Sequence, residues 1–374
     1  MSNRNLQALY KKTGGFIKGI CHPNNNIALL KEAGIEWVRR DVPFPFDTDG
    51  KLSQHYLDFK KSSRMFDANG ISNICITPYP FMFIQAGIDV TTREGLAQVT
   101  EICAFLAEDF KDIKICWQAT NEMHIQGFRA PLNVIQAKDF LVASIKGIKQ
   151  GNPSAAVGHN SLNNEWLSLC MQIEEETGGC DYIGLDLYDG TWSSGGPDTY
   201  CEKIDHYYSI LQKPIILMEF GFASKGDMME DPEAEAVVCL KTLGFDSIEN
   251  AISDLGSLID KLPERIADRV KACAPEDRLN CVMSSMPHIL KKWPVKNDIP
   301  HTEEGQAAFF AQLLPLLMEN KHLGGAVIFC MSDSTHCFYC GESDCPCETG
   351  WGLIRYDGSK KPAYDVVKKV FTQK

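Results

Sequence analysis

Apolar residues fall into two alternating patterns along most of the chain. Short runs rich in β-branched residues predict strands, and longer stretches with an apolar residue every three or four positions predict amphipathic helices. The strands are expected within the segments 16–22, 37–46, 72–79, 113–124, 155–160, 182–188, 214–224 and 325–332. The helices are expected within the segments 27–33, 52–68, 96–106, 131–149, 165–176, 197–211, 302–320 and 362–371.

Eight strand–helix pairs in this order predict the α/β class and a (β/α)8 TIM barrel. The alternative is a doubly wound open sheet. That fold carries a glycine-rich phosphate loop after a strand, and no such loop follows any of the predicted strands. We therefore expect one barrel domain that spans residues 1–374.

The alternation of strands and helices breaks after Ser224. Residues 225–300 have an amphipathic pattern of their own, with apolar side chains at intervals of three and four residues. These side chains are Ile248, Ile252, Leu255, Ile259 and Leu262. We expect a helical insertion after the seventh strand, because the barrel pattern resumes beyond it. The insertion either packs against the barrel only or also forms one wall of a pocket, and the sequence leaves both roles open.

Two glutamates stand out near the ends of predicted strands. Glu122 lies where the apolar pattern of IKICWQATNEMH stops, and Glu219 lies inside the apolar run PIILMEFGF. Glu122 on its own could simply begin a solvated loop. An unpaired buried carboxylate is costly, so Glu219 is either catalytic or part of a structural ion pair. In a barrel the strand ends meet at one mouth, where two facing carboxylates meet the requirement for glycoside hydrolysis.

Other polar residues at predicted strand ends would line the same mouth. His22 and Asp186 are expected to bind substrate there. A positive charge on Arg39 would keep a neighbouring carboxylate ionised. The remaining polar residues at strand ends are Asp41, Tyr79, Asn121, His124, His159, Asn160, Tyr188, Asp333 and His336.

Four segments resemble motifs of the clan A retaining glycoside hydrolases, a superfamily of (β/α)8 barrels that contains cellulases, mannanases, β-galactosidases and β-xylosidases. Residues 117–122 resemble its Trp-x-x-x-Asn-Glu motif, and residues 213–221 resemble its Lys-Pro-(apolar)-x-x-x-Glu-Phe-Gly motif. Residues 34–39 resemble Gly-x-x-x-Val-Arg, and residues 351–364 resemble the segment that leads into the last helix. The four motifs occur in the order and on the predicted strands that the superfamily has.

The resemblance implies a role for each matching residue. Glu122 would be the general acid/base, and Glu219 would be the nucleophile. Asn121 would hydrogen-bond the sugar 2-hydroxyl, and Arg39 would lie beside the nucleophile. Tyr188 takes the position of a tyrosine that contacts the nucleophile in many members, although a core tyrosine would give the same pattern.

Two segments depart from the superfamily pattern. The eighth strand reads IFCMSDS and lacks the tryptophan on which many members stack the sugar. Trp351 or Trp192 is expected to supply that surface instead. The third strand ends in Pro78-Tyr79-Pro80 where some families have a histidine. Both departures leave the subfamily and the sugar undetermined.

Composition and charge narrow the class of partner. Of the 374 residues, 44% are hydrophobic and 23% are charged, which is ordinary for a globular protein. The net charge of −12 argues against nucleic acid and against an anionic membrane, because both need a basic footprint. The chain opens without a signal-peptide core, and no run approaches the roughly 20 apolar residues of a membrane span. We therefore expect a cytoplasmic protein.

Fifteen cysteines, many in apolar patterns, favour the reduced thiols of a cytoplasm over a secreted disulfide framework. Cys337, Cys340, Cys345 and Cys347 form a C-x2-C-x4-C-x-C cluster after the eighth strand. A structural zinc site with four thiolates, free thiols and a disulfide or redox pair all fit this cluster, and the short C-x-C half is irregular for zinc. No cofactor is expected for catalysis.

The sequence thus predicts a retaining glycosidase that cleaves β-linked oligosaccharides or glycosides by double displacement. The superfamily implies a covalent glycosyl-enzyme and carboxyl groups about 5 Å apart. A transglycosylase would use the same glutamate pair, and a carbohydrate-binding barrel without catalysis is a further alternative. The sequence does not distinguish exo from endo action or indicate an oligomeric state.

Overall fold

The computed structural model describes residues 2–295 and 298–373. Residues 1 and 374 of the expected domain, and residues 296–297 of the expected insertion, lie outside the described residues. Across the described residues, eight parallel strands form one sheet in the order β5-β4-β3-β2-β1-β8-β7-β6. The strands are β1 (Ile17–Cys21), β2 (Trp37–Asp41), β3 (Ser72–Ile76), β4 (Ile115–Gln118), β5 (Ala156–Gly158), β6 (Ile183–Leu187), β7 (Ile215–Phe220) and β8 (Leu323–Ile328).

The two edge strands of this order, β5 and β6, are brought together by backbone hydrogen bonds. The amide of Asp181 donates to the carbonyl of Val157 at 2.8 Å, and the amide of Gly184 donates to the carbonyl of His159 at 2.7 Å. The sheet therefore forms a nearly closed barrel. The predicted (β/α)8 fold is confirmed, and the doubly wound open sheet is excluded.

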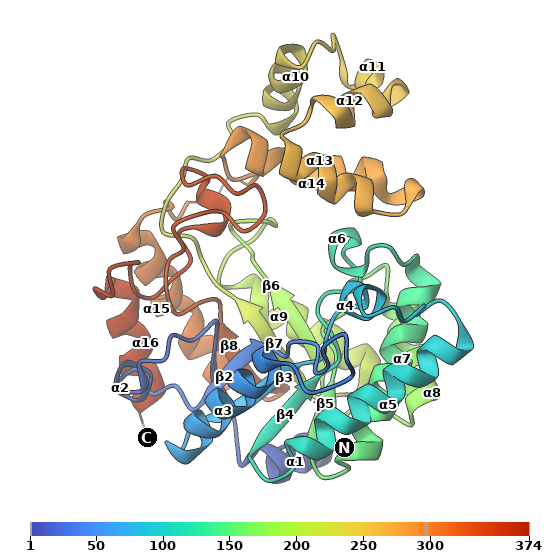
Figure 1. The fold of residues 1–374 in the computed structure, drawn as a ribbon. Helices are drawn as coiled ribbons and strands as arrows, with labels where there is room; N and C mark the ends of the chain where they lie inside the picture. The colour runs from blue at the N-terminus through green and yellow to red at the C-terminus, as the bar shows by residue number, and fades with distance from the viewer. Residues whose placement is uncertain (1, 296–297, 374) are drawn as a thin grey trace.

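Helices alternate with the strands along the chain and surround the barrel (Figure 1). They are α2 (Ile27–Glu32), α3 (Gln54–Ala68), α4 (Pro80–Gln85), α5 (Arg93–Asp109), α6 (Gln126–Arg129), α7 (Val134–Gly151), α8 (Leu167–Thr177), α9 (Thr199–Leu211), α15 (Glu303–Glu319) and α16 (Pro362–Thr372). The short helices α4 and α6 follow β3 and β4 and were not predicted, since neither is long enough to show a helical period.

Helix α1 (Ser2–Thr13) precedes the first strand, in a segment where the sequence pattern predicted no element. Leu9 is buried with Ile17 and Trp37, which lie inside the barrel. Lys12 donates to Asp181, just before β6, at 2.9 Å. Helix α1 therefore covers the end of the barrel where the strands begin.

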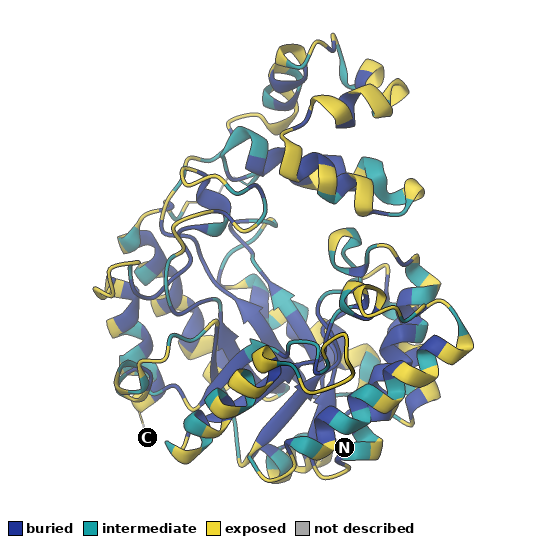
Figure 2. Ribbon diagram, in the orientation of Figure 1, coloured by how far each residue is buried: buried dark blue, intermediate teal, exposed yellow. Residues whose placement is uncertain are grey.

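Outside a bulge in β7, side chains on the strands alternate between the helices and the barrel interior, as the two-residue period of a strand requires. On β4, Ile115 and Trp117 join the core shared with the helices, whereas Cys116 joins the core inside the barrel. The strands are largely buried on both faces, so most of the sheet is dark blue in Figure 2. This double burial explains why the strands read as near-continuous apolar runs.

Between β7 and α15 the chain forms five α-helices and a 3-10 turn among the described residues. They are α10 (Pro232–Thr242), α11 (Ile248–Ser253), α12 (Leu255–Lys261), α13 (Glu264–Ala272), η1 (Pro275–Asp277) and α14 (Arg278–Leu290). The single amphipathic pattern from Ile248 to Leu262 is divided into two helices at Asp254, whose side chain caps α12 by accepting from the amide of Ser257. Helix propensity alone did not reveal this break.

These helices lie beyond one end of the barrel (Figure 1). Arg129, at the end of α6, forms a buried ion pair with Asp277 at 2.5 Å. Because α6 follows β4, this ion pair ties the inserted helices to the end of the barrel where the strands stop. The inserted helices therefore reach across the mouth that carries the strand-end residues.

Most of the cysteines are free thiols. Among the described residues, thirteen of the fifteen cysteines are free, and Cys273 and Cys281 form a disulfide next to α13 and α14. The expectation of reduced thiols is therefore wrong for this pair, which the turn at η1 brings together.

The described helices include none with the length and apolar character that crossing a membrane requires.

Candidate active site

Arg39 is the centre of a buried polar network at the ends of the strands. Its side chain projects from β2 into the barrel and is 2% exposed. Its Nη1 donates to Glu219 Oε1 at 2.6 Å, its Nη2 to Asn121 Oδ1 at 2.6 Å and its Nε to Gln118 Oε1 at 2.8 Å. One guanidinium therefore links β2 with β4 and β7.

Glu219 reaches this network because β7 contains one extra residue. Leu217 pairs with Leu185 on β6 and Glu219 pairs with Asp186, so Met218 is a bulge. Met218 joins the core inside the barrel, and Glu219 turns the same way to meet Arg39, instead of facing the helices as strict alternation requires. The bulge thus directs a carboxylate into the mouth from an apolar strand.

Both oxygens of Glu219 accept hydrogen bonds. Arg39 occupies Oε1, and the hydroxyl of Tyr188 donates to Oε2 at 2.5 Å. A guanidinium and a phenol on the two oxygens stabilise the anionic form of a carboxylate. Tyr188 is therefore a partner of this glutamate and not an apolar core residue.

Glu122 lies opposite Glu219, at the end of β4. Its environment favours the protonated form of the carboxyl group. Burial and the neighbouring Glu219 carboxylate raise the pKa of Glu122 to about 8, against the opposing effects of Arg39 and Asn121. Its backbone is in the left-handed region with φ 45°, which costs free energy for a residue with a Cβ. The backbone amide donates to Asn160 Oδ1 at 2.9 Å, which holds that conformation.

Two asparagines join the parts of the network. Asn121 Nδ2 donates to Glu122 Oε2 at 3.1 Å, while its Oδ1 accepts from Arg39. Asn160 Nδ2 donates to Asn121 Oδ1 at 2.7 Å and to Asp186 Oδ2 at 2.6 Å. The orientation of each amide is therefore fixed by its neighbours.

Asp186 adds a third carboxyl group. One oxygen from each of Glu122, Asp186 and Glu219 lies within 4.8 Å of the others. Burial, followed by the charges of Glu219 and Glu122, raises the pKa of Asp186 well above its usual range. Its buried Oδ1 has no hydrogen-bond partner among the described residues. An unsatisfied acceptor or donor beside two glutamates is what a bound ligand would satisfy.

Three carboxyl groups this close could also hold a divalent cation. However, Arg39 and Tyr188 occupy both oxygens of Glu219, and the guanidinium supplies the positive charge that a cation would bring. The donor set therefore suits an acid–base pair with its own counter-ion better than a metal site.

Aromatic rings form one side of the site. Phe329, after β8, contacts the rings of His22 at 5.3 Å and Tyr188 at 6.1 Å. Trp351 contacts Tyr188 at 5.0 Å and packs against Gly221, where an added Cβ would lie 2.5 Å from the Phe329 carbonyl. Trp351 is 2% exposed, so its ring supports its neighbours and presents little free face.

Trp192 lies apart from the carboxyl groups. Its ring contacts Trp293 at 5.2 Å and His288 at 5.4 Å, on the side of the inserted helices. His22 is exposed beside Phe329. Trp351 or Trp192 was expected to stack on a sugar. Trp351 is instead buried against Tyr188, and Trp192 packs against the insertion.

Several polar residues at strand ends have partners outside the network of Arg39. Tyr79 donates to Asp41 at 2.8 Å, and Lys361 forms an ion pair with Asp333 at 2.7 Å. Burial lowers the pKa of His124 and of His159 to about 4. The exposed His336 bonds Ser334 and Thr335, its neighbours in the loop after β8.

Comparisons with known proteins find the same architecture. No family model and no curated protein matches the sequence. Among solved structures, a β-glucuronidase of Bacteroides uniformis has TM-score 0.56 at 13% identity, over 95% of this chain and 35% of that one. A family 39 glycoside hydrolase of Bacteroides cellulosilyticus WH2 has TM-score 0.56 at 13% identity, over 96% and 64%. The GH53 catalytic domain of Ignisphaera aggregans has TM-score 0.55 at 17% identity, over 97% and 93%.

What these proteins share with this chain is the fold. The chain spans between about a third and a half of the length of the β-glucuronidases that it matches, namely 46% and 35% for two of them. All three solved structures described above carry names of glycoside hydrolases, and each is similar to this chain over nearly all of the chain's length.

Sequence reasoning missed two residues near the site. Glu348, half-buried in the loop after β8, has its pKa raised to about 8 by burial, by Cys337 and by Glu219. His288, on α14, meets Cys337, Cys340 and Cys345. Neither residue lies at a strand end, and His288 is far from the cysteines in sequence, so no local signal points to them.

Proposed function

We propose that the protein is a retaining glycoside hydrolase that acts on β-linked sugars. The observation that carries this proposal is the pair Glu122 and Glu219, which face each other with oxygens within 4.8 Å. Retaining glycosidases hold their two carboxyl groups about 5–5.5 Å apart, and inverting ones hold them about 6.5–9.5 Å apart. The separation favours retention.

The two carboxyl groups lie in different environments, as the chemistry needs. Glu219 is paired with Arg39 and accepts from Tyr188, which suits a nucleophile. Glu122 has its pKa raised to about 8, so near neutral pH it carries the proton that a general acid must donate. Environments that differ in this way assign the two roles.

In the first step, Glu122 transfers its proton to the glycosidic oxygen as the bond from that oxygen to the anomeric carbon breaks. An oxygen of Glu219 forms an ester bond to the same carbon. In the second step, Glu122, now a carboxylate, takes a proton from water, whose oxygen attacks the anomeric carbon. The ester bond breaks, and Glu219 returns to the carboxylate form.

The neighbouring residues position substrate and nucleophile. Arg39 stabilises the carboxylate before attack and after release, and Tyr188 holds its orientation. Asn121 lies between the two glutamates, where its amide can address the sugar 2-hydroxyl. Asp186 offers its unpartnered Oδ1 to another hydroxyl.

The charge of the site favours a neutral sugar. Uronic acids carry a carboxylate that needs a cation, and Arg39 has its Nε, Nη1 and Nη2 committed to Gln118, Glu219 and Asn121. The named β-glucuronidases are therefore a guide to fold and reaction class more than to substrate. We propose short neutral β-glycosides or oligosaccharides.

A screen of aryl β-glycosides with the wild type, Glu219→Ala and Glu122→Ala tests the proposal. Loss of the nucleophile should lower kcat on the order of 10⁴-fold or more. Azide should rescue Glu219→Ala and give a glycosyl azide of inverted anomeric configuration. Glu319→Ala, which removes an exposed glutamate of α15, is the matched control and should leave the rate unchanged.

Several results would oppose the proposal. Wild-type activity in Glu219→Ala would remove the nucleophile assignment. Sugar binding without turnover in the wild type would favour a carbohydrate-binding barrel. Product analysis with an added acceptor sugar separates hydrolysis from transglycosylation, because both use the same glutamate pair.

We also propose a cytoplasmic location. Thirteen of the fifteen cysteines, all within the described part of the chain, are free. Persistent free thiols are typical of reducing compartments. Fractionation of the source cells tests this, and recovery of the protein from an extracellular fraction would contradict it.

A further inference from the structure

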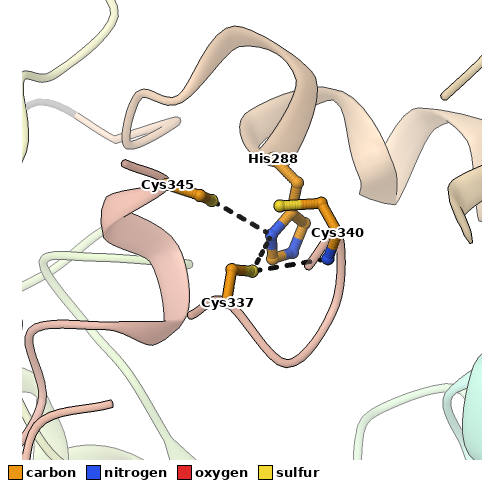
Figure 3. Close-up of side chains that lie close together, drawn as sticks. All are labelled: His288, Cys337, Cys340 and Cys345. Atoms are coloured by element: carbon orange, nitrogen blue, oxygen red, sulfur yellow. Dashed lines mark hydrogen bonds between the residues drawn. The ribbon is translucent and has the colours of Figure 1, made fainter. Parts of the chain in front are cut away.

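A cluster of sulfur and nitrogen ligands lies between the inserted helices and the loop after β8. Cys337, Cys340 and Cys345 come from the loop, and His288 comes from the last turn of α14. All four side chains are buried, and Figure 3 shows them converging on one point. His288 Nδ1 lies 3.4 Å from Cys337 Sγ and 3.7 Å from Cys345 Sγ.

The geometry is close to that of a four-coordinate metal site. One ligand atom from each of the four residues lies within 4.8 Å of the others. In a regular zinc tetrahedron with bonds of about 2.3 Å, sulfur atoms are about 3.8 Å apart. A contraction of an ångström or less would therefore give each ligand a bonding distance. Three thiolates and one imidazole are a common structural zinc set, and Cys337 and Cys340 form the usual C-x2-C half.

The arrangement also differs from the four-cysteine set that the sequence suggested. Cys347 is not a member of the converging group, and its Sγ donates instead to the carbonyl of Pro287 at 3.6 Å. His288 stands in its place. This removes the irregular C-x-C half from the ligand set.

Neighbouring groups hold the four ligands in position. The ring of His288 stacks on Tyr339 with centroids 4.2 Å apart, and the hydroxyl of Tyr339 lies 2.8 Å from Ser285 Oγ on α14. The amide of Cys340 donates to Cys337 Sγ at 3.5 Å, an interaction that favours a thiolate. Outer contacts of this kind orient metal ligands.

The same loop leads directly into the candidate active site. Thr349 Oγ1 donates to the carbonyl of Cys345 at 2.6 Å, and Trp351 Nε1 donates to the carbonyl of Cys347 at 2.6 Å. Trp351 then packs against Tyr188. The position of Tyr188 therefore depends, through two contacts, on where the cysteine loop is held.

We propose that His288, Cys337, Cys340 and Cys345 bind one Zn²⁺ ion and that this ion fastens the inserted helices to the loop after β8. The site is structural: all four coordination positions belong to the protein, so none is open for substrate. Its role is to fix the loop that carries Glu348 and Trp351. The proposal does not depend on which reaction the protein catalyses.

The test is the metal content of the full-length protein, purified in reducing buffer without chelator and measured by elemental mass spectrometry. The wild type should contain about one zinc ion per chain. His288→Ala and Cys340→Ser should lose the metal. Cys347→Ser and Cys201→Ser should keep it, because Cys347 lies outside the ligand set and Cys201 lies on α9.

Two further measurements guard against simple misfolding. His288→Cys replaces nitrogen by sulfur and should retain zinc, which separates loss of a ligand from loss of the fold. Wild-type protein reconstituted with Co²⁺ should show a thiolate-to-cobalt charge-transfer band. Absence of both zinc and the cobalt band from the wild type overturns the proposal. Retention of zinc in His288→Ala with loss in Cys347→Ser also overturns it, because the metal would then sit on four thiolates.

Discussion

Two clusters of ionisable side chains lie at the same end of the barrel, and they differ in how their charge is balanced. The carboxyl cluster of Glu122, Asp186 and Glu219 has Arg39 inside it. In the thiol–imidazole cluster around His288, the nearby guanidinium of Arg269 lies over Tyr339 and bonds the carbonyl of Phe338. An arginine inside the site balances the carboxylate charge and leaves a second carboxyl group free to transfer a proton. A cluster of thiols without a paired cation is suited to bind a metal ion.

The largest expected effect comes from removing Arg39, the cation inside the carboxyl cluster. Arg39→Met should lower kcat/KM on the order of 10³-fold, because Glu219, the proposed nucleophile, loses its electrostatic partner. It should also lower the free energy of unfolding by about 3–5 kcal/mol, because Glu219 would stay buried without its ion pair. Steady-state kinetics and denaturant unfolding measure the two effects.

Arg64→Met is the matched control for Arg39→Met. It removes an exposed ion pair with Asp112 and should change neither quantity measurably. In Arg39→Met the three carboxyl groups should also acquire affinity for Ca²⁺ or Mg²⁺ that the wild type lacks. Wild-type rates in Arg39→Met would show that the cation is not part of the site's chemistry.

The second test concerns the proton on Glu122. Because the pKa of Glu122 is raised to about 8, kcat/KM should fall as pH rises through about 8, where this proposed general acid loses its proton. Glu122→Gln should reduce kcat by about 10²–10⁴-fold on substrates with poor leaving groups, and the alkaline limb should disappear. A pH–rate profile in which Glu122→Gln keeps that limb would assign it to another group.

The same residue links activity to stability. The folded state raises the pKa of Glu122 from 4.5 to about 8, so its contribution to stability is fully present below pH 4.5 and is lost as pH rises through about 8. The wild type is therefore destabilised as Glu122 ionises in the folded state. Glutamine does not ionise, so Glu122→Gln has no such loss of stability at high pH. The Tm of Glu122→Gln relative to the wild type should therefore increase from pH 5 to pH 8, measured by scanning calorimetry; a constant difference would contradict this.

A third test connects the two clusters. Chelation of the proposed zinc, or His288→Ala, should release the loop that carries Trp351 and so loosen Tyr188, which bonds Glu219. We expect kcat/KM to fall about tenfold, equivalent to about 1.4 kcal/mol of transition-state stabilisation. Activity of His288→Cys close to that of the wild type would support positioning by the metal, and full activity of the metal-free protein would separate the clusters.

The smallest expected effect comes from an ion pair beside the thiol–imidazole cluster. Lys291, after α14, pairs with Asp344 in the cysteine loop at 2.5 Å, and both side chains are exposed. Exposed pairs contribute little because water and salt screen them. Asp344→Asn should leave both the zinc content and the Tm unchanged. A large loss of zinc in this variant would show that the surface pair, and not the buried ligands, holds the loop.

Much of the barrel could be predicted because parallel strands buried on both faces leave a strong apolar pattern. The convergence of Glu122, Glu219, Arg39, Asn121 and Tyr188 followed from the fold, since strand ends of a barrel meet at one mouth. Their catalytic roles stay predictions. The parallel strand order places these residues at the same end of the sheet. A correct prediction of the fold therefore also predicted that they lie close together.

Other parts left no local signal in the sequence. His288 meets the cysteines only because α13 and α14 fold back over the mouth, which no periodicity encodes. Helix α1 is short and mostly polar, and Leu9 supplies its buried apolar contact with the barrel interior. The division of the pattern at Asp254 depends on a side-chain cap that competes with helix continuation.

The extra residue in β7 means that the number of residues in this strand encodes chemistry as much as their identity does. Leu217 and Phe220 face the helices, and Met218 and Glu219 between them face the interior. If Met218 stayed but the bulge were lost, regular alternation would present Glu219 to the apolar layer beneath α9 and α15 and turn Phe220 inward, since a one-residue slip exchanges the two faces of a strand. The direction of this carboxylate is thus set by the register of β7, and a variant that kept the glutamate but lost the bulge would move it out of the mouth.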